Sequence, residues 1–271
     1  MASSSDRGRF ARGCRTSIVR TLPVLLWAVA LLPVLAPTPI HGQDLTEDAR
    51  RDRIMQWQAR ATPADCKALT EALADESFDL RSRAASALYW KCDRADAANF
   101  APLLCKTLAL QNAEAGAVLL LGYAKPETAV PCLQEAARQR RMVKLAISAR
   151  PVPIALPVKV ALARLNQAES VRELRAAFEK PEVETSLFLL GVLRDIEDRE
   201  ALRASLRFLD DEREAPGAVS HAVRAVRDVA VEALVARFSL RPAFPIEPGR
   251  RYTARELAEI RALAEQRISS L

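Results

Sequence analysis

The chain has 271 residues, of which 50% are hydrophobic, 27% are charged and 5% are aromatic. It is too apolar for a disordered protein, and eight glycines are too few for a collagen-like one. Abundant Ala, Leu, Arg and Glu favour helices, because these side chains lose little entropy there. A β-protein needs more β-branched and aromatic residues. The composition therefore predicts an all-α protein.

The first 42 residues have the pattern of an export signal. Five arginines and one aspartate precede an uninterrupted apolar run at residues 22–36, as in a secretory signal peptide. This run of about 15 residues is short of the roughly 20 that a spanning helix needs. We predict a signal peptide over residues 1–42, cleaved after Gly42, and a periplasmic or extracellular chain. An uncleaved leader that anchors the protein in a membrane is the alternative.

Most of the positive charge belongs to this leader. The whole chain carries a formal charge of +6, whereas residues 43–271 contain 35 basic and 33 acidic residues and carry only +2. Nucleic-acid binding requires a strongly basic face that displaces counterions. We therefore expect no nucleic-acid partner, and a membrane contact only if the leader stays attached.

Four cysteines remain after the leader: Cys66, Cys92, Cys105 and Cys132. Their even number in an exported chain predicts two disulfides. They form no C-x-x-C motif and have no histidine nearby, which argues against a zinc site. The alternative is that some of them are buried free thiols. The sequence suggests no cofactor.

The exported chain divides into three parts. Residues 43–62 are polar and predict a lead-in helix around residues 50–57. From residue 63 to 240, apolar residues recur at helical spacing in short segments separated by prolines. Residues 241–271 contain a proline-broken linker and then Thr253-x-x-Glu256, a capping box. This last part predicts a C-terminal capping helix.

One pattern recurs inside the central region. Residues 80–88 contain an apolar residue followed by Arg, two alanines at helical spacing and Leu. Residues 226–234 contain the same pattern. Weaker copies end at Leu121, Leu162 and Leu190. Small residues at these positions allow a neighbouring helix to approach closely.

Residues 73–88, with a turn aspartate at Asp75 and an arginine at Arg81, resemble the HEAT repeat of the armadillo-like α-solenoid family. The resemblance covers residues 63–240 as about five helix pairs. It implies a right-handed α-solenoid in which the second-helix arginine binds a turn acid, Asp75 or Asp79 for Arg81, with Arg227 in the same role in the last copy. The irregular spacing predicts inserted loops at residues 138–153 and 210–220.

The helix pairs also suggest which cysteines meet. Cys66 lies one turn into the first helix of a pair and Cys92 lies just past the end of the second, so an antiparallel hairpin brings them together. Cys105 and Cys132 lie in first helices of neighbouring pairs. Our alignment offsets them by roughly 9 Å along the helix axis, which makes this second pairing less favourable.

We find no pattern of residues that indicates catalysis. His221 is the only histidine after residue 42 and adjoins Ser220, which excludes the geometry of a catalytic triad. Two acidic runs, at 195–200 and 210–214, lie in turns where carboxylates serve helix starts. We expect the acids to be solvated and the protein not to be an enzyme. The acids of these two runs are Asp195, Glu197, Asp198, Glu200, Asp210, Asp211, Glu212 and Glu214.

We therefore predict an exported, non-catalytic scaffold that binds a protein or peptide. Second-helix residues off the apolar stripe, Arg83 and Ser86, are candidate contacts. A dense basic cluster could bind an acidic partner or be a solvated loop, and it consists of Arg138, Arg140, Arg141, Lys144 and Arg150. Trp57, Tyr89 and Trp90 are either interface anchors or core. The alternatives are an enzyme or enzyme subunit that resembles bilin lyases, and a structural component of the cell envelope.

Overall fold

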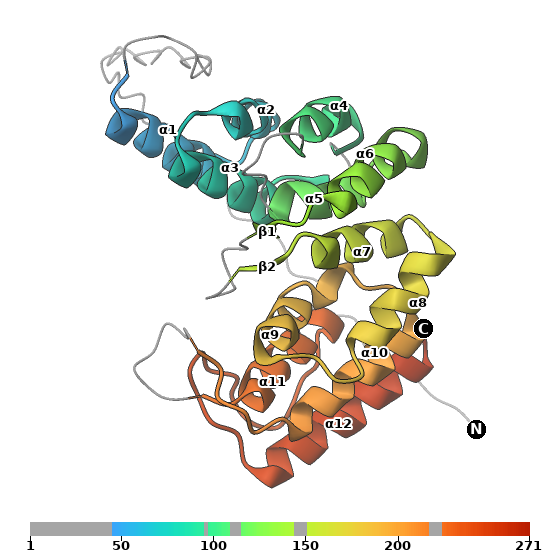
Figure 1. Ribbon diagram of the computed structural model, residues 1–271. Helices are drawn as coiled ribbons and strands as arrows, with labels where there is room; N and C mark the ends of the chain where they lie inside the picture. Colours follow the sequence, from blue (N-terminus) through green and yellow to red (C-terminus); the bar gives the residue numbers. More distant parts are fainter. Residues whose placement is uncertain (1–44, 95–96, 109–114, 144–150, 217–223) are drawn as a thin grey trace, which may run out of the picture. The chain divides into compact units, whose positions relative to one another are not determined.

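The computed structural model describes residues 45–94, 97–108, 115–143, 151–216 and 224–271 (Figure 1). The described residues form an all-α fold with twelve α-helices, as the composition predicts. The predicted leader lies outside the described residues. The helices are α1 (Glu47–Arg60), α2 (Pro63–Glu71), α3 (Phe78–Lys91), α4 (Ala97–Leu108), α5 (Ala115–Leu121), α6 (Pro126–Arg138), α7 (Ala155–Arg164), α8 (Ala168–Ala177), α9 (Val183–Gly191), α10 (Arg199–Ser205), α11 (Val226–Phe238) and α12 (Ala254–Ser269). Three 3-10 turns accompany them: η1 (Ala72–Ala74), η3 (Leu193–Asp195) and η4 (Leu206–Asp210).

The first two helices begin at threonine caps. Thr46 accepts the backbone N–H of Ala49 at the start of α1. Thr62 and Asp65 form a capping box at the start of α2, where Pro63 occupies the first turn. The predicted lead-in helix is thus longer than residues 50–57, and it packs on α2 and α3.

Helix α5 is the centre of one series of neighbouring helices. Every residue of α5 is buried, and an α-helix that is apolar on all sides must be enclosed by other elements. α3 packs on α5 and α5 packs on α7, while α9 packs on α11. The even-numbered helices form a second series of neighbours, in which α2 contacts α4 and α4 contacts α6, and α8 contacts α10, which contacts α12.

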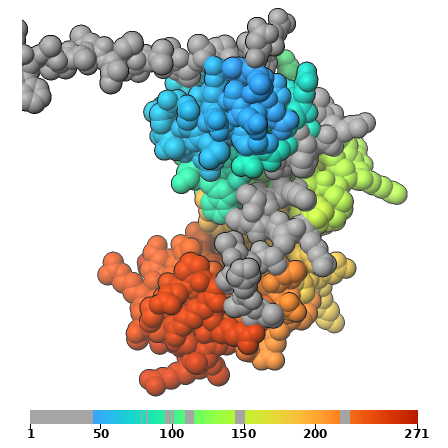
Figure 2. Space-filling view, turned by 90° about the vertical axis from the view of Figure 1, so that its left-hand side faces the viewer, coloured from blue at the N-terminus to red at the C-terminus, as the bar shows by residue number. Residues whose placement is uncertain are grey.

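α7 connects two groups of helices. It packs on α5 and α6 on one side and on α8 on the other. The elements up to α6 and those from α8 onward gather in separate parts of the molecule (Figures 1 and 2). Any further contact between these two groups of helices therefore adds to the rigidity of the fold.

Gly116 lets α5 approach α3 closely. A Cβ atom at this position would lie 2.5 Å from the carbonyl oxygen of Ala85 and 3.3 Å from the Cβ of Tyr89. The first of these is a backbone atom, which can yield only if the helix itself shifts.

We expect Gly116→Ala to lower the free energy of unfolding by about 1–3 kcal/mol, because overpacking outweighs the helix propensity that alanine adds. Urea unfolding followed by circular dichroism measures this. Gly122→Ala is the matched comparison, since its closest contact would be 3.0 Å, to the Cα of Ala161, and its loss should be smaller. A Gly116→Ala chain as stable as the wild type would contradict the close approach.

The two predicted insertions differ in structure. Residues 138–153, expected as a loop, contain a two-stranded antiparallel hairpin of β1 (Met142–Val143) and β2 (Val152–Pro153), in which Val143 pairs with Val152. Both valines are buried, so the hairpin is held by apolar contact as well as backbone pairing. Residue 210 ends the 3-10 turn η4, and the segment from 211 to 216 is irregular with an isolated bridge between Glu214 and Ala225. Residues 217–220 lie outside the description.

The C-terminal segment is fixed to the preceding helices by buried polar contacts. Thr253 and Glu256 form the predicted capping box of α12, which packs on α10 and α11. Asp228 is buried at the start of α11, where it accepts the backbone N–H groups of Ala225 and Tyr252. One carboxylate therefore joins the start of α11 to the linker that precedes α12.

Candidate functional site

Asp195, in the turn after α9, is the centre of the densest buried polar cluster among the described residues. It is 2% exposed, and its two carboxylate oxygens accept the hydroxyl groups of Tyr89 and Tyr123. Tyr89 is fully buried at the end of α3, and Tyr123 follows α5. The two phenols thus bind the same carboxylate from elements that lie far from it in the sequence.

Three arginines surround these residues. Arg94 donates from Nη1 to the Tyr123 hydroxyl at 2.6 Å and lies 3.3 Å from Asp195. Arg194 donates from Nη2 to the carbonyl oxygen of Tyr89 at 2.6 Å. Arg164 stacks on the ring of Tyr123, with 3.7 Å between its guanidinium carbon and the ring centroid. We call the group the Asp195 cluster, and it consists of Tyr89, Trp90, Arg94, Tyr123, Arg164, Arg194 and Asp195.

The ends of four helices position the cluster. α3, α5, α7 and α9 all end beside it. Every member, Arg94 included, lies in the last turn of one of these helices or within four residues after its end. The C-terminus of a helix carries a partial negative charge and unpaired carbonyl groups. Arginines at these ends are therefore favourable, as the bond from Arg194 to the Tyr89 carbonyl illustrates.

The environment of the tyrosines keeps them protonated. Burial raises the pKa of Tyr89 far above its ordinary value, and the negative charge of Asp195 acts in the same direction. Burial, with the hydrogen bond to Asp195, raises the pKa of Tyr123 to about 12. A phenolate nucleophile is therefore disfavoured at neutral pH, and the carboxylate accepts two hydrogen bonds that limit its use as a base. The arrangement suits the joining of helices better than proton transfer.

We expect an alkaline titration at 295 nm to show much less tyrosinate near pH 10 in the folded chain than in the unfolded chain, because Tyr89 and Tyr123 stay protonated. All three tyrosines of the chain, Tyr89, Tyr123 and Tyr252, have a raised pKa in the folded state. The unfolded chain loses these protons near pH 10 while the folded chain retains them. The tyrosines' contribution to stability is therefore complete below about pH 10 and is lost as pH rises toward 12 and above.

The control is the same titration in 6 M guanidinium chloride, where all three groups should ionise near pH 10. A full tyrosinate signal at pH 10–10.5 in a chain that remains folded by circular dichroism would contradict the buried cluster.

The expectation that the acidic runs are solvated is wrong for Asp195 and right in part for the others. Asp198 caps α10 and binds Arg175 through both carboxylate oxygens at 2.8 and 2.6 Å. The hydrogen bond from Arg175 lowers the pKa of Asp198. Asp195 differs because the chain after α9 turns inward, where the tyrosines and arginines compensate the cost of burying a charge.

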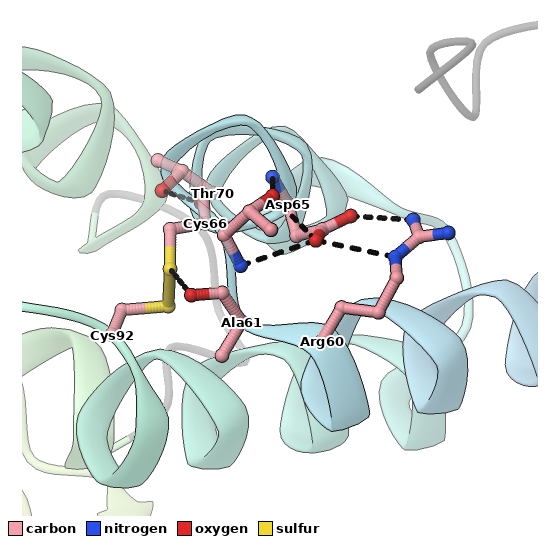
Figure 3. Close-up of a disulfide and its surroundings, with 7 residues drawn as sticks. Arg60, Ala61, Asp65, Cys66, Thr70 and Cys92 are labelled. Atoms are coloured by element: carbon pink, nitrogen blue, oxygen red, sulfur yellow. Dashed lines mark hydrogen bonds and ion pairs between the residues drawn. A yellow bond between two sulfur atoms is a disulfide. The ribbon is translucent and has the colours of Figure 1, made fainter. Parts of the chain in front are cut away.

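Both disulfides are formed. Cys66 pairs with Cys92 across 5.8 Å between Cα atoms, from the first turn of α2 to the residue after α3, as the helix-hairpin argument predicts (Figure 3). Beside it, the buried carboxylate of Asp65 binds Arg60 at 2.5 Å (Figure 3).

The second disulfide corrects our helix alignment. Cys105 and Cys132 are 5.7 Å apart between Cα atoms and bonded, so the offset of roughly 9 Å is wrong. α4 and α6 are neighbours with the two cysteines at the same level. That offset came from matching the apolar positions Phe100 and Leu133 of the two helices, and this match placed the register incorrectly.

In the first copy of the repeated pattern, the arginine binds the turn through atoms other than the predicted carboxylate. Arg81 donates from Nη1 to the backbone carbonyls of Asp75 and Glu76, at 2.6 and 2.8 Å, and not to a carboxylate. The Asp75 carboxylate instead lies 3.2 Å from Nε of Arg50 in α1. Arg81 still fixes the turn, but through backbone atoms.

Arg227 behaves as expected, because it binds Glu212 in the turn before α11. The acidic partner precedes the helix in sequence, as the resemblance implies for Asp75. The two copies of the pattern therefore share the arginine and differ in the atom that it binds.

The predicted basic cluster separates into unlike residues. Arg138 and Arg140 are exposed, and Arg138 pairs with Glu135 at 2.7 Å. Arg141 turns inward and donates to the carbonyl oxygen of Leu108 at 2.8 Å, and burial lowers its pKa. A single binding patch of all five residues is thus wrong for Arg141. Lys144 and Arg150 lie outside the described residues.

The other candidates are dispersed. Arg83 is exposed and pairs with Asp79 at 2.8 Å, while Ser86 is half-buried. Trp57 is buried in the core, so it does not serve as an exposed anchor. His221 and Ser220 lie outside the described residues.

An open hollow of about 380 Å³ lies between the end of α8 and η4. Its two arginines already bind backbone carbonyls, Arg207 those of Phe178 and Glu179, and Arg213 that of Pro181. Across the described ranges, no group of three or more histidine, cysteine or acidic side chains is arranged to hold a metal ion. The Asp195 cluster therefore remains the strongest candidate site.

Comparisons of the chain with known proteins find no relative. No protein-family model, no curated protein and no solved structure matches the chain. Within the described residues, no helix is long and apolar enough to span a membrane. Two disulfides are typical of proteins exported to an oxidising compartment.

The sequence analysis did not identify the Asp195 cluster, although the repeat contained a signal for it. Tyr89, Tyr123, Arg164 and Arg194 lie one to four residues after the terminal leucines of four copies of the repeated pattern. A polar or aromatic residue that recurs just beyond a repeated buried leucine predicts a shared polar layer at that end of the helices.

Proposed function

We propose that this protein is an exported HEAT-like α-solenoid that serves as a rigid, non-catalytic scaffold for a protein or peptide partner. The observation that best supports it is the repeated packing of like helices on like helices: α2 on α4 and α4 on α6, α3 on α5 and α5 on α7, and, after α7, α8 on α10 and α9 on α11. Stacked helix pairs of this kind expose extended side-chain rows that suit protein binding.

Three features support rigidity. The disulfides join α2 to the end of α3 and α4 to α6. The Asp195 cluster joins the ends of α3 and α5 to the turn after α9. A preorganised surface loses less entropy when a partner binds. We place the protein in the periplasm or outside the cell, since its disulfides need an oxidising compartment.

The test is co-purification followed by reconstitution. Residues 43–271 with a C-terminal tag serve as bait in the native envelope fraction, and a reduced, alkylated and unfolded sample of the same chain is the matched control. We expect a protein that binds only the folded bait and that, once purified, forms a defined complex with it in size-exclusion chromatography with light scattering. Loss of every candidate at the reconstitution step would contradict the scaffold function.

A further inference from the structure

The outer face of the Asp195 cluster is formed by arginines. Asp195 is 2% exposed, whereas the side chains of Arg94, Arg164 and Arg194 are 28%, 20% and 26% exposed. The carboxylate is buried, and the three arginines that contact the cluster are partly exposed and come from three different chain segments. This juxtaposition is a property of the tertiary structure, since the residues lie up to 100 positions apart.

The guanidinium groups of Arg164 and Arg194 stack on aromatic rings. Arg164 stacks 3.7 Å over Tyr123, and Arg194 lies 3.9 Å over Trp90 and 4.2 Å over Tyr89, as guanidinium carbon to ring centroid. A guanidinium group stacked on a ring keeps its N–H donors at its edge, where they match the two oxygens of a carboxylate. The stacking thus fixes the orientation before a ligand arrives.

Donors remain available on all three arginines. Within the described residues, Arg94 and Arg164 make hydrogen bonds or ion pairs through Nη1. Arg194 donates from Nη2 and has a longer ion pair, at 4.0 Å, from Nε to Asp195, so its Nη1 is the donor that remains for a ligand. In the part of the chain that the structure describes, the ion pairs of these three arginines are with two carboxylates: Arg94 and Arg194 with the buried Asp195, and Arg164 with the exposed Glu197 at 2.6 Å. The three cations therefore outnumber the carboxylates that pair with them by one.

Glu197 shows which ligand this surface accepts. It is 59% exposed and already places a carboxylate on Arg164 from the solvent side. An acidic side chain of a partner can bind the remaining donors of Arg94 and Arg194 in the same manner. A nucleic acid is less suitable, because residues 43–271 carry only +2 overall and lack the broad basic face that phosphate backbones require.

We propose that Arg94, Arg164 and Arg194 form a docking surface for an acidic segment of a protein partner. This inference rests on the proposed scaffold function and names the part of the partner that the scaffold binds. Specificity comes from short-range pairing between fixed guanidinium groups and clustered Asp or Glu side chains.

The experiment selects ligands without assuming one. Folded residues 43–271 are panned against a phage-displayed library of random dodecapeptides, and enriched peptides are labelled with fluorescein for anisotropy titrations at 50 and 150 mM NaCl. The variants are Arg164→Gln and Arg194→Gln. Arg203→Gln and Arg261→Gln are matched controls, because each of these two arginines is paired with an exposed acid.

We expect enriched peptides with clustered Asp and Glu that bind Arg164→Gln and Arg194→Gln at least tenfold more weakly and bind both controls like the wild type. Neutral or basic peptides that bind all variants equally would overturn the acidic docking surface and leave the scaffold function intact. Arginine-dependent binding of a single-stranded 12-mer DNA, without binding of acidic peptides, would also overturn it. A selection that enriches no binding peptide would count against the scaffold function itself.

A variant that binds acidic peptides more tightly tests the surface without the ambiguity of misfolding, because misfolding weakens binding. Glu197→Gln removes the carboxylate that occupies Arg164 and keeps the size of the side chain. We expect acidic peptides to bind this variant at least threefold more tightly than they bind the wild type. Unchanged or weaker binding would show that Arg164 does not contribute to the surface.

Discussion

Replacing Asp195 with alanine is expected to lower the free energy of unfolding by about 3–5 kcal/mol, the largest effect of any single substitution that we predict. The change removes the acceptor of both tyrosine hydroxyls and leaves the phenol of Tyr89 buried without a partner. Arg94 also loses its ion pair at 3.3 Å. Each of these buried groups then carries a desolvation cost that nothing offsets.

Urea unfolding followed by circular dichroism measures this loss. In a domain of this size each kcal/mol corresponds to about 2–4 °C in Tm, so we also expect a fall of roughly 10 °C or more. Glu197→Ala, two residues further along the same turn, is the control, because its carboxylate is 59% exposed and an exposed pair contributes about 1 kcal/mol or less. Equal losses for Asp195→Ala and Glu197→Ala would mean that Asp195 is not the buried centre.

The substitution also tests the connection between the two groups of helices. Tyr89 lies 106 residues before Asp195 and Tyr123 lies 72 residues before it. Hydrogen exchange should therefore quicken at the ends of α3 and α5 as well as in the turn after α9. Faster exchange confined to the turn would show that the tyrosines are held without Asp195.

Reducing the Cys66–Cys92 disulfide is expected to cost about 3–4 kcal/mol of stability, the second-largest effect. The bond closes a loop of 26 residues and limits the conformations of the unfolded chain. It also joins the start of α2 to the end of α3 near the beginning of the described chain.

The measurement isolates this one bond. In a Cys105→Ala/Cys132→Ala chain that begins at residue 43, Cys66–Cys92 is the only disulfide that can form, so the oxidised and reduced samples have the same side chains. Their urea midpoints give the contribution of the bond directly. A difference below about 1 kcal/mol would indicate that the reduced chain keeps the hairpin closed by packing alone.

The two disulfides show how far helix geometry can be predicted. Cys66 and Cys92 lie within one antiparallel hairpin, whose ends meet whatever the exact register, and their pairing is predicted correctly. Cys105 and Cys132 belong to α4 and α6, and their relative height depends on how neighbouring helices pack. An alignment of apolar positions left an error of several residues there, because small shifts along a helix preserve the same apolar stripe.

The sequence by itself determined the local features of this protein: the all-α class, the capping box at Thr253, and the hairpin disulfide. These depend on composition, on residues three positions apart, or on the two ends of one helix hairpin, which a reader of the sequence can compare directly. Only the tertiary structure decided which charged residues are buried. Asp195 and Arg141 resemble their exposed neighbours in sequence. They differ because distant parts of the chain supply hydrogen-bond partners, two tyrosine hydroxyls for the buried Asp195 and the Leu108 carbonyl for the half-buried Arg141, which make burial favourable.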